Sequence, residues 1–138
     1  DLAELVEATL APYRNHASIE INGPAVQIHR TCLSPLALML HEWATNAVKY
    51  GALGASGGEL SVRWERVPDG VRLDWRETGD RPVSVESGTG FGTILVQTSS
   101  RQLGVAVTRS AEDHVFAIQI HLPAKVLAND EDGDAHRG

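Results

Sequence analysis

Four side chains recur at helical spacing in the middle of the sequence, and together they could bind a nucleotide. Glu42, Asn46 and Lys49 lie at i, i+4 and i+7, and Tyr50 follows at i+8. A helix would place all four on one face. Carboxylate and carboxamide oxygens are ligands for Mg²⁺, and an ammonium group can bind phosphate. The spacing therefore favours a metal and phosphate site, with a solvated polar helix face as the alternative.

A carboxylate ends an apolar row further along the chain. Val71, Leu73, Trp75 and Glu77 alternate with polar residues, which is typical of one face of a strand. An unpaired buried carboxylate is costly, so Glu77 should have a partner at the end of this strand. The exocyclic amine of adenine would be such a partner, whereas guanine presents a carbonyl there. The alternative is a glutamate on the protein surface, the usual place for this residue.

A glycine-rich segment precedes the last predicted helix. It reads Gly88-Thr89-Gly90-Phe91-Gly92, and the helix is predicted from about Thr93 to Leu103. Such glycines let a backbone surround phosphates, and a helix N-terminus offers unpaired N–H groups to an anion. Because a flexible turn has the same composition, this segment is weak evidence by itself.

The elements that must position these side chains follow from apolar periodicity and turn residues. Helices are predicted over residues 2–10, 35–50 and 93–103, and hairpins over residues 19–28, 60–75 and 105–122. Ser34 is expected to cap the long helix, and Gly51 follows its end. A second stripe of this helix is predicted to face the core and comprises Leu36, Met39, Leu40, Trp43 and Ala47. Hairpins between helices predict an α/β two-layer sandwich, in which helices cover one face of a mixed, mostly antiparallel sheet.

Size, composition and charge restrict the class of protein. The chain has 138 residues, of which 42% are hydrophobic and 22% charged, as in a globular domain. We predict one domain over residues 1–123 and a polar, acidic, disordered tail over residues 124–138. The net charge of −6 and the lack of a basic stripe argue against nucleic acid as a partner. The single cysteine, Cys32, suits a reducing compartment, and neither a membrane-spanning run nor a signal peptide is evident.

Two of these segments resemble the signature motifs of one protein family. The stretch from His41 to Leu53 is similar to the asparagine box of the HWE histidine kinases, in which a histidine occupies the place of His41. Trp75-Arg76-Glu77 matches the Trp-x-Glu motif that completes the signature. The resemblance covers roughly residues 1–123 in the order of elements. It implies the ATPase fold that histidine kinases share with gyrase and MutL.

The resemblance implies a role for each matched residue of the long helix. Asn46 would coordinate Mg²⁺, and Glu42 would hold a metal-bound water or accept the proton lost by the attacking histidine. Lys49 would face the phosphates and act with these two in catalysis, while Tyr50 would wall the nucleotide. His41 is counted among the nucleotide-binding residues without a catalytic role, and a histidine hydrogen-bonded within the fold is the alternative.

The resemblance also assigns the adenine and phosphate ends of the site. Glu77-Thr78-Gly79 would replace the Asp-x-Gly motif of most relatives, with Gly79 letting the backbone approach the base. The residues expected at the phosphates, as the second glycine box, are Gly88, Gly90, Gly92 and Thr93. The sequence departs from the family in Gly79-Asp80-Arg81-Pro82, where Gly-Gly-Pro-Pro is common. An acidic residue there could weaken nucleotide binding, or Arg81 could compensate.

The function implied is that of the ATP-binding catalytic domain of a bacterial, cytoplasmic sensor histidine kinase that uses ATP and Mg²⁺. Its γ-phosphoryl acceptor would be a histidine on a dimerisation domain absent from this chain, so the chain alone should not autophosphorylate. Residues 1–14 would be the remnant of a linker to that domain. Further expected partners are a sensor domain and a response regulator, without membrane contact by this chain. The alternatives are an anti-sigma-type serine kinase of the same fold and an inactive nucleotide-binding or protein-binding module.

Overall fold

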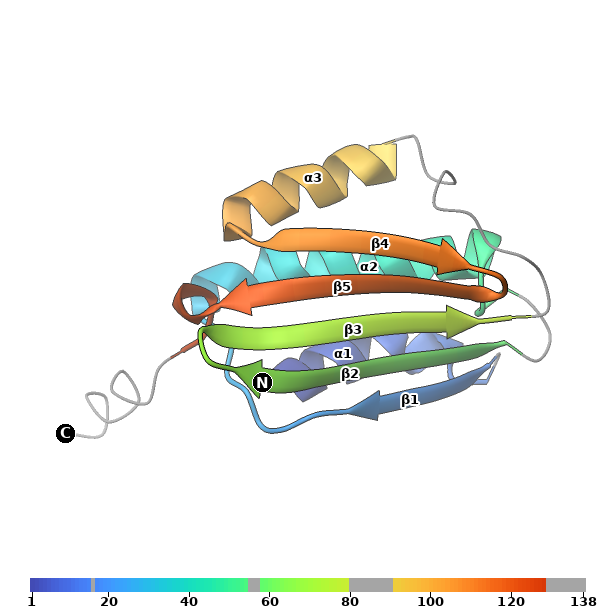
Figure 1. Cartoon of the computed structure of the whole chain (residues 1–138), viewed down its shortest axis with the longest axis horizontal. Coiled ribbons are helices and arrows are strands. Elements are labelled where there is room, and N and C mark those ends of the chain that lie inside the picture. Colours follow the sequence, from blue (N-terminus) through green and yellow to red (C-terminus); the bar gives the residue numbers. More distant parts are fainter. Residues whose placement is uncertain (16, 55–57, 80–90, 129–138) are drawn as a thin grey trace.

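The computed structural model describes residues 1–15, 17–54, 58–79 and 91–128, with the helical backbone alone for residues 91–93. Five strands form one sheet in the order β1-β2-β3-β5-β4 (Figure 1). Their bounds are β1 Ser18–Asn22, β2 Glu59–Val67, β3 Gly70–Thr78, β4 Ala106–Glu112 and β5 Val115–Pro123. β1 runs parallel to β2, and the other neighbouring pairs are antiparallel.

Helices cover one face of this sheet (Figure 1). Their bounds are α1 Leu2–Leu10, α2 Leu33–Tyr50 and α3 Phe91–Leu103. The central helix α2 contacts both α1 and α3. Within the described ranges, no helix combines the length and the apolar character needed to cross a membrane. The predicted α/β sandwich, with a mostly antiparallel sheet covered on one face, is therefore confirmed.

The core lies between the sheet and the helices, and alternation along the strands produces it. On β3, Val71, Leu73 and Trp75 are fully buried, while Arg72 and Asp74 between them reach solvent. Side chains of opposite polarity therefore separate onto the two faces of the strand. The apolar stripe predicted on α2 is buried throughout and comprises Leu36, Met39, Leu40, Trp43 and Ala47.

The predicted hairpin over residues 19–28 is wrong. Its first half forms β1, which pairs in parallel with β2, and its second half forms no strand. Contacts with a side chain of β2 explain the difference. Gly23 approaches Trp64 so closely that an added Cβ would lie 2.2 Å from the indole ring, and the indole Nε1 donates to the carbonyl of Pro24 over 2.9 Å. The segment is held against this indole and does not turn back along β1.

The predicted starts of the second and third helices lie further along the chain than the observed ones, whereas α1 begins at Leu2 as predicted. α2 begins at Leu33, directly after a 3-10 turn over Arg30–Cys32. Ser34 therefore lies inside the helix and is not its cap. α3 begins at Phe91, two residues before the predicted start at Thr93. At α3 the helix thus extends into a segment whose glycines indicate a loop.

The folded body extends beyond the boundary predicted at residue 123. A 3-10 turn follows over Ala124–Val126, and Val126 is 1% exposed. Leu127 forms a β-bridge with Ile28. The chain after β5 therefore closes over the segment that follows β1, and the predicted disordered tail is wrong for residues 124–128. Residues 129–138 lie outside the described part.

Candidate functional site

The predicted metal and phosphate side chains lie along one side of α2. Glu42 and Asn46, one helical turn apart, are half-buried, while Lys49 and Tyr50 are exposed. The hydroxyl of Thr45, between the first two, donates to the carbonyl of Glu42 over 3.0 Å. Thr45 is thus occupied by its own helix. Within the described ranges, the side-chain oxygens of Glu42 and Asn46 make no hydrogen bond to another side chain or to the backbone.

α2 ends in a compact turn that uses its backbone amides internally. The carbonyl of Ala47 accepts from the amides of Gly51, Leu53 and Gly54 at 3.0, 3.1 and 3.2 Å. The remaining amide of this turn belongs to Ala52, which is 2% exposed. It donates to a side chain from a different element, the carboxylate of Glu77.

Glu77 is buried at the end of β3, with 4% of its surface exposed. Its Oε1 accepts from the backbone N–H of Ala52 over 3.1 Å, and its Oε2 accepts from the indole Nε1 of Trp75 over 2.9 Å. Burial raises the pKa of the Glu77 carboxyl, and these two hydrogen bonds oppose that rise. The buried carboxylate therefore has its partners within the chain.

The approach of Glu77 to the turn requires a glycine. A Cβ added at Gly51 would lie 2.0 Å from Oε1 of Glu77. The neighbouring Trp75 is fully buried and packs edge-on against Trp43 of α2, with ring centroids 5.8 Å apart. Two contacts therefore connect the end of β3 to α2: an aromatic pair in the core and a hydrogen-bonded carboxylate at the helix end.

Gly79, directly after β3, borders open space. Its amide donates to the carbonyl of His114 over 3.1 Å, which holds its backbone. A Cβ added at this position would meet no atom within 4 Å. The position is therefore held in place beside Glu77, and its glycine is not required by contacts within the described chain.

Of the remaining predicted site residues, the structure describes the side chain of His41 alone. His41 is exposed on α2. Gly92 and Thr93 lie in the first turn of α3, and their side-chain surroundings are not described. Gly88 and Gly90 lie outside the described residues.

In the described part of the chain, the predicted metal ligands are two side chains of α2, those of Glu42 and Asn46. Among the residues described, no three or more His, Cys, Asp or Glu side chains gather in a metal-binding group. Glu42 and Asn46 fit Mg²⁺ nonetheless, because this ion keeps several waters and takes its other ligands from phosphates. An all-protein cage is not needed for it.

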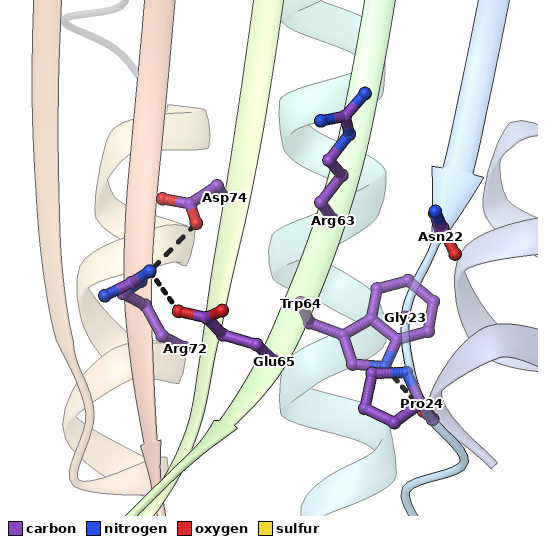
Figure 2. A pocket seen from close by; sticks show the side chains of 8 residues that line it. All are labelled: Asn22, Gly23, Pro24, Arg63, Trp64, Glu65, Arg72 and Asp74. Carbon is purple, nitrogen blue, oxygen red and sulfur yellow. Dashed lines mark hydrogen bonds and ion pairs between the residues drawn. The ribbon is translucent and has the colours of Figure 1, made fainter.

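A hollow of about 400 Å³ lies elsewhere, on the open face of the sheet. Figure 2 shows its lining, where Arg72 pairs with Glu65 and, at 3.5 Å, with Asp74. The indole of Trp64 reaches its rim from β2. Since the Arg72 guanidinium is already paired, this hollow has the character of an ionic surface, and it is separate from the group around Glu77.

Sequence reasoning missed the amide of Ala52 and the role of Gly51. A backbone amide has no residue-type signal, so no motif could have identified it. Gly51 was noted as the residue after the long helix, but a glycine there is common at any helix end. The close approach to Glu77 is visible only once both segments are placed.

Comparison with models of protein families gives no match. Proteins with related sequences are nevertheless found. The chain is 34% identical over 125 residues to blue-light-activated histidine kinase 1 of Erythrobacter litoralis. The aligned region covers 87% of this chain and 35% of that protein. It is 32% identical over 126 residues to the blue-light-activated histidine kinase of Rhizobium johnstonii, covering 89% and 36%. The chain therefore spans about one third of the length of these relatives.

Solved structures with the same fold are also found. The histidine kinase domain of a blue-light-activated histidine kinase from Erythrobacter litoralis aligns with a TM-score of 0.75 at 15% identity, over 90% of this chain and 59% of that one. The catalytic domain of the histidine kinase ThkA aligns with a TM-score of 0.69 at 14% identity, over 89% and 93%. At these identities the likeness establishes the fold.

Proposed function

The chain belongs to the histidine kinases, with the sequence and fold of their catalytic domain, and we propose that it binds Mg²⁺-ATP for transfer of the γ-phosphoryl group to a histidine. The observation that carries this proposal is the placement of Glu42 and Asn46, both half-buried, one turn apart on α2, with the exposed Lys49 on the same helix. In phosphoryl transfer a protein contributes mainly position and charge neutralisation. These groups are suited to both tasks.

Each residue of α2 has a distinct task in the proposed site. Asn46 and Glu42 would hold Mg²⁺, which would neutralise charge on the phosphates when bound. Lys49 would contact the phosphates, and its exposed ammonium can reach a ligand without leaving a buried partner unpaired. Tyr50, 60% exposed, would become covered by the nucleotide. An aromatic ring left open at the edge of a site is suited to this role.

The base would lie at the end of β3. Gly79 leaves space at its Cα, and each oxygen of Glu77 accepts one protein donor while retaining a second lone pair. Adenine's amino group can use such a lone pair. A guanine carbonyl facing the same carboxylate would leave two acceptors unpaired, at a cost of about 1–3 kcal/mol. We therefore expect ATP to bind roughly ten to a hundred times more tightly than GTP.

The phosphoacceptor histidine would come from a dimerisation domain of the parent protein. His41 lies on the catalytic helix itself, and His29, His114 and His121 lie outside the long helices in the described part of the chain. A sensor domain and a response regulator would complete the pathway. The isolated chain should therefore bind nucleotide without labelling itself, and radiolabelled ATP tests this directly.

Isothermal calorimetry with Mg²⁺-ATP tests the proposed function. We expect Asn46→Ala to weaken binding at least tenfold, the effect of losing about 1.4 kcal/mol. Asn22→Ala is a matched control, because it removes the same side chain from the far, open face of the sheet. Equal binding by wild type and Asn46→Ala would refute the metal assignment.

Gly79→Ala tests the base site separately. The added methyl group meets nothing within 4 Å in the free chain, so thermal stability should be unchanged. If adenine lies against this backbone, the methyl group should lower affinity for ATP. Unchanged affinity would place the base elsewhere.

A further inference from the structure

The turn that ends α2 depends on one side chain for its last hydrogen bond. Of the amides of residues 51–54, those of Gly51, Leu53 and Gly54 bond to the carbonyl of Ala47, within the same segment. The amide of Ala52 bonds to Glu77, 25 residues further along the chain. Because Ala52 is buried, this amide has no ready substitute in solvent.

The carboxylate is itself held in one orientation. Trp75 Nε1 donates to one oxygen and Ala52 N to the other, at 2.9 and 3.1 Å. Gly51 leaves just enough room for the oxygen that faces the turn. Both protein partners are donors, so the position requires a side chain of this length with two acceptors. A glutamate satisfies that requirement.

On the basis of the proposed nucleotide site, we propose that Glu77 is a positioning residue whose carboxylate locks the Gly51–Gly54 turn and thereby the last turn of α2. That last turn carries Lys49 and Tyr50, immediately before Gly51. The final residues of a helix fray when their backbone groups lack partners. Release of the turn would move both side chains and weaken binding of any nucleotide, whatever its base.

The proposal can be tested by changing whether the side chain at position 77 offers acceptors to both of its donors. In Glu77→Gln the amide oxygen can accept from one donor, but the NH₂ group then faces the other donor. Replacing Trp75 by Phe removes the indole donor from that pair. The double variant Trp75→Phe/Glu77→Gln can therefore keep the bond from the Ala52 amide without a donor facing the NH₂ group. We therefore expect Trp75→Phe to restore part of the nucleotide affinity that Glu77→Gln loses.

The experiment compares wild type, Trp75→Phe, Glu77→Gln and the double variant, all below their unfolding temperatures. Calorimetry gives the dissociation constants of Mg²⁺-ATP and Mg²⁺-GTP, and hydrogen exchange reports on the Ala52 amide. We expect Glu77→Gln to weaken GTP roughly tenfold through release of the turn, to weaken ATP by more because the proposed adenine contact is altered as well, and to speed exchange at Ala52. The double variant should recover most of the loss for GTP and of the protection at Ala52.

Val71→Ala is the control for general loss of stability. This fully buried residue lies near the opposite end of β3 and does not touch the turn. Its truncation should destabilise the fold while leaving nucleotide affinity and Ala52 exchange close to wild type. Equal losses of affinity in Val71→Ala and Glu77→Gln would overturn the proposal, because Glu77 would then act through stability alone.

Other outcomes are equally decisive. A loss for ATP but not for GTP in Glu77→Gln would mean that Glu77 acts on the base alone. A double variant no better than Glu77→Gln would refute the donor mismatch. If neither folds, Gly51→Ala displaces the carboxylate by another route, and unchanged affinity in that variant overturns the proposal. If wild type does not bind Mg²⁺-ATP, the proposed function itself fails.

Discussion

Carboxylates on the two faces of the sheet differ in their exposure and in their hydrogen-bond partners. On the open face, Glu20 pairs with Arg63 at 2.6 Å, and both side chains are more than half exposed. On the covered face, Glu77 is 4% exposed and takes its hydrogen bonds from an indole and a backbone amide. The first arrangement can re-form with water or another ion. The second leaves buried donors unpaired if it is lost.

The difference indicates which polar residues can be replaced without consequence and which cannot. Opposite charges lie side by side on the open face, where Arg72 pairs with Glu65 of the neighbouring strand and with Asp74 of its own strand (Figure 2). Such pairs contribute little to stability and tolerate replacement. The buried carboxylate connects β3 to the end of α2, where the proposed phosphate-binding side chain lies. Its surroundings are specific to it, so its loss has consequences beyond the local charge.

The largest expected effect is on stability, from Glu77→Ala. Removing the carboxylate leaves Ala52 N and Trp75 Nε1 buried without acceptors, at about 1–3 kcal/mol each. We expect a loss of roughly 2–4 kcal/mol in the free energy of unfolding, since removal of a buried carboxyl offsets part of the cost. Urea denaturation measures it. Glu20→Ala on the open face is the control, and similar losses in the two variants would break the comparison.

The second largest expected effect is on the pH dependence of stability, through the titration of the buried Glu77. Burial raises the pKa of Glu77 above its ordinary value of 4.5, so the folded state binds this proton more tightly than the unfolded state does. The stability it contributes is fully present below the unfolded pKa and is lost as pH rises through the folded pKa. Glu77→Gln cannot titrate there. The free energy of unfolding of wild type, relative to Glu77→Gln, should therefore fall with rising pH, and a rise would contradict the direction of the shift.

Trp64 lies where the two faces meet and should show an intermediate effect. Its ring is 4% exposed, and its Nε1 donates to the carbonyl of Pro24. Trp64→Phe removes that donor and part of the contact with Gly23. We expect a loss of about 1–2 kcal/mol in the free energy of unfolding, from the hydrogen bond and the reduced packing. Thermal denaturation measures it, and no change would mean that the segment after β1 is held by other contacts.

The smallest expected effect is on the open face. Arg63→Ala breaks the pair with Glu20, and exposed pairs of this kind contribute about 0.2–1 kcal/mol. The difference between wild type and variant should shrink further in high salt, because screening weakens exposed charges. Urea denaturation at two salt concentrations measures both. A loss as large as that of Glu77→Ala would contradict the difference between the two faces.

Much of the fold was predictable because burial leaves a period in the sequence. The stripe of α2 and the alternation of β2 and β3 follow from apolar spacing, and both are confirmed. The hairpin over residues 19–28 failed for a related reason. Alternation indicates a strand but not its partner, and β1 pairs with β2 across some 40 residues of sequence.

The sequence by itself determined which residues could do chemistry: an oxygen pair and a cation on one helix face, and a carboxylate ending an apolar strand. Only the tertiary structure decided what surrounds them. Ala52 meets Glu77 through its backbone, and a backbone amide is the same in every residue type except proline. Gly51 is needed because a distant carboxylate occupies the space of its missing Cβ. Such contacts depend on where two segments come to lie, and residue type and spacing do not encode that position locally.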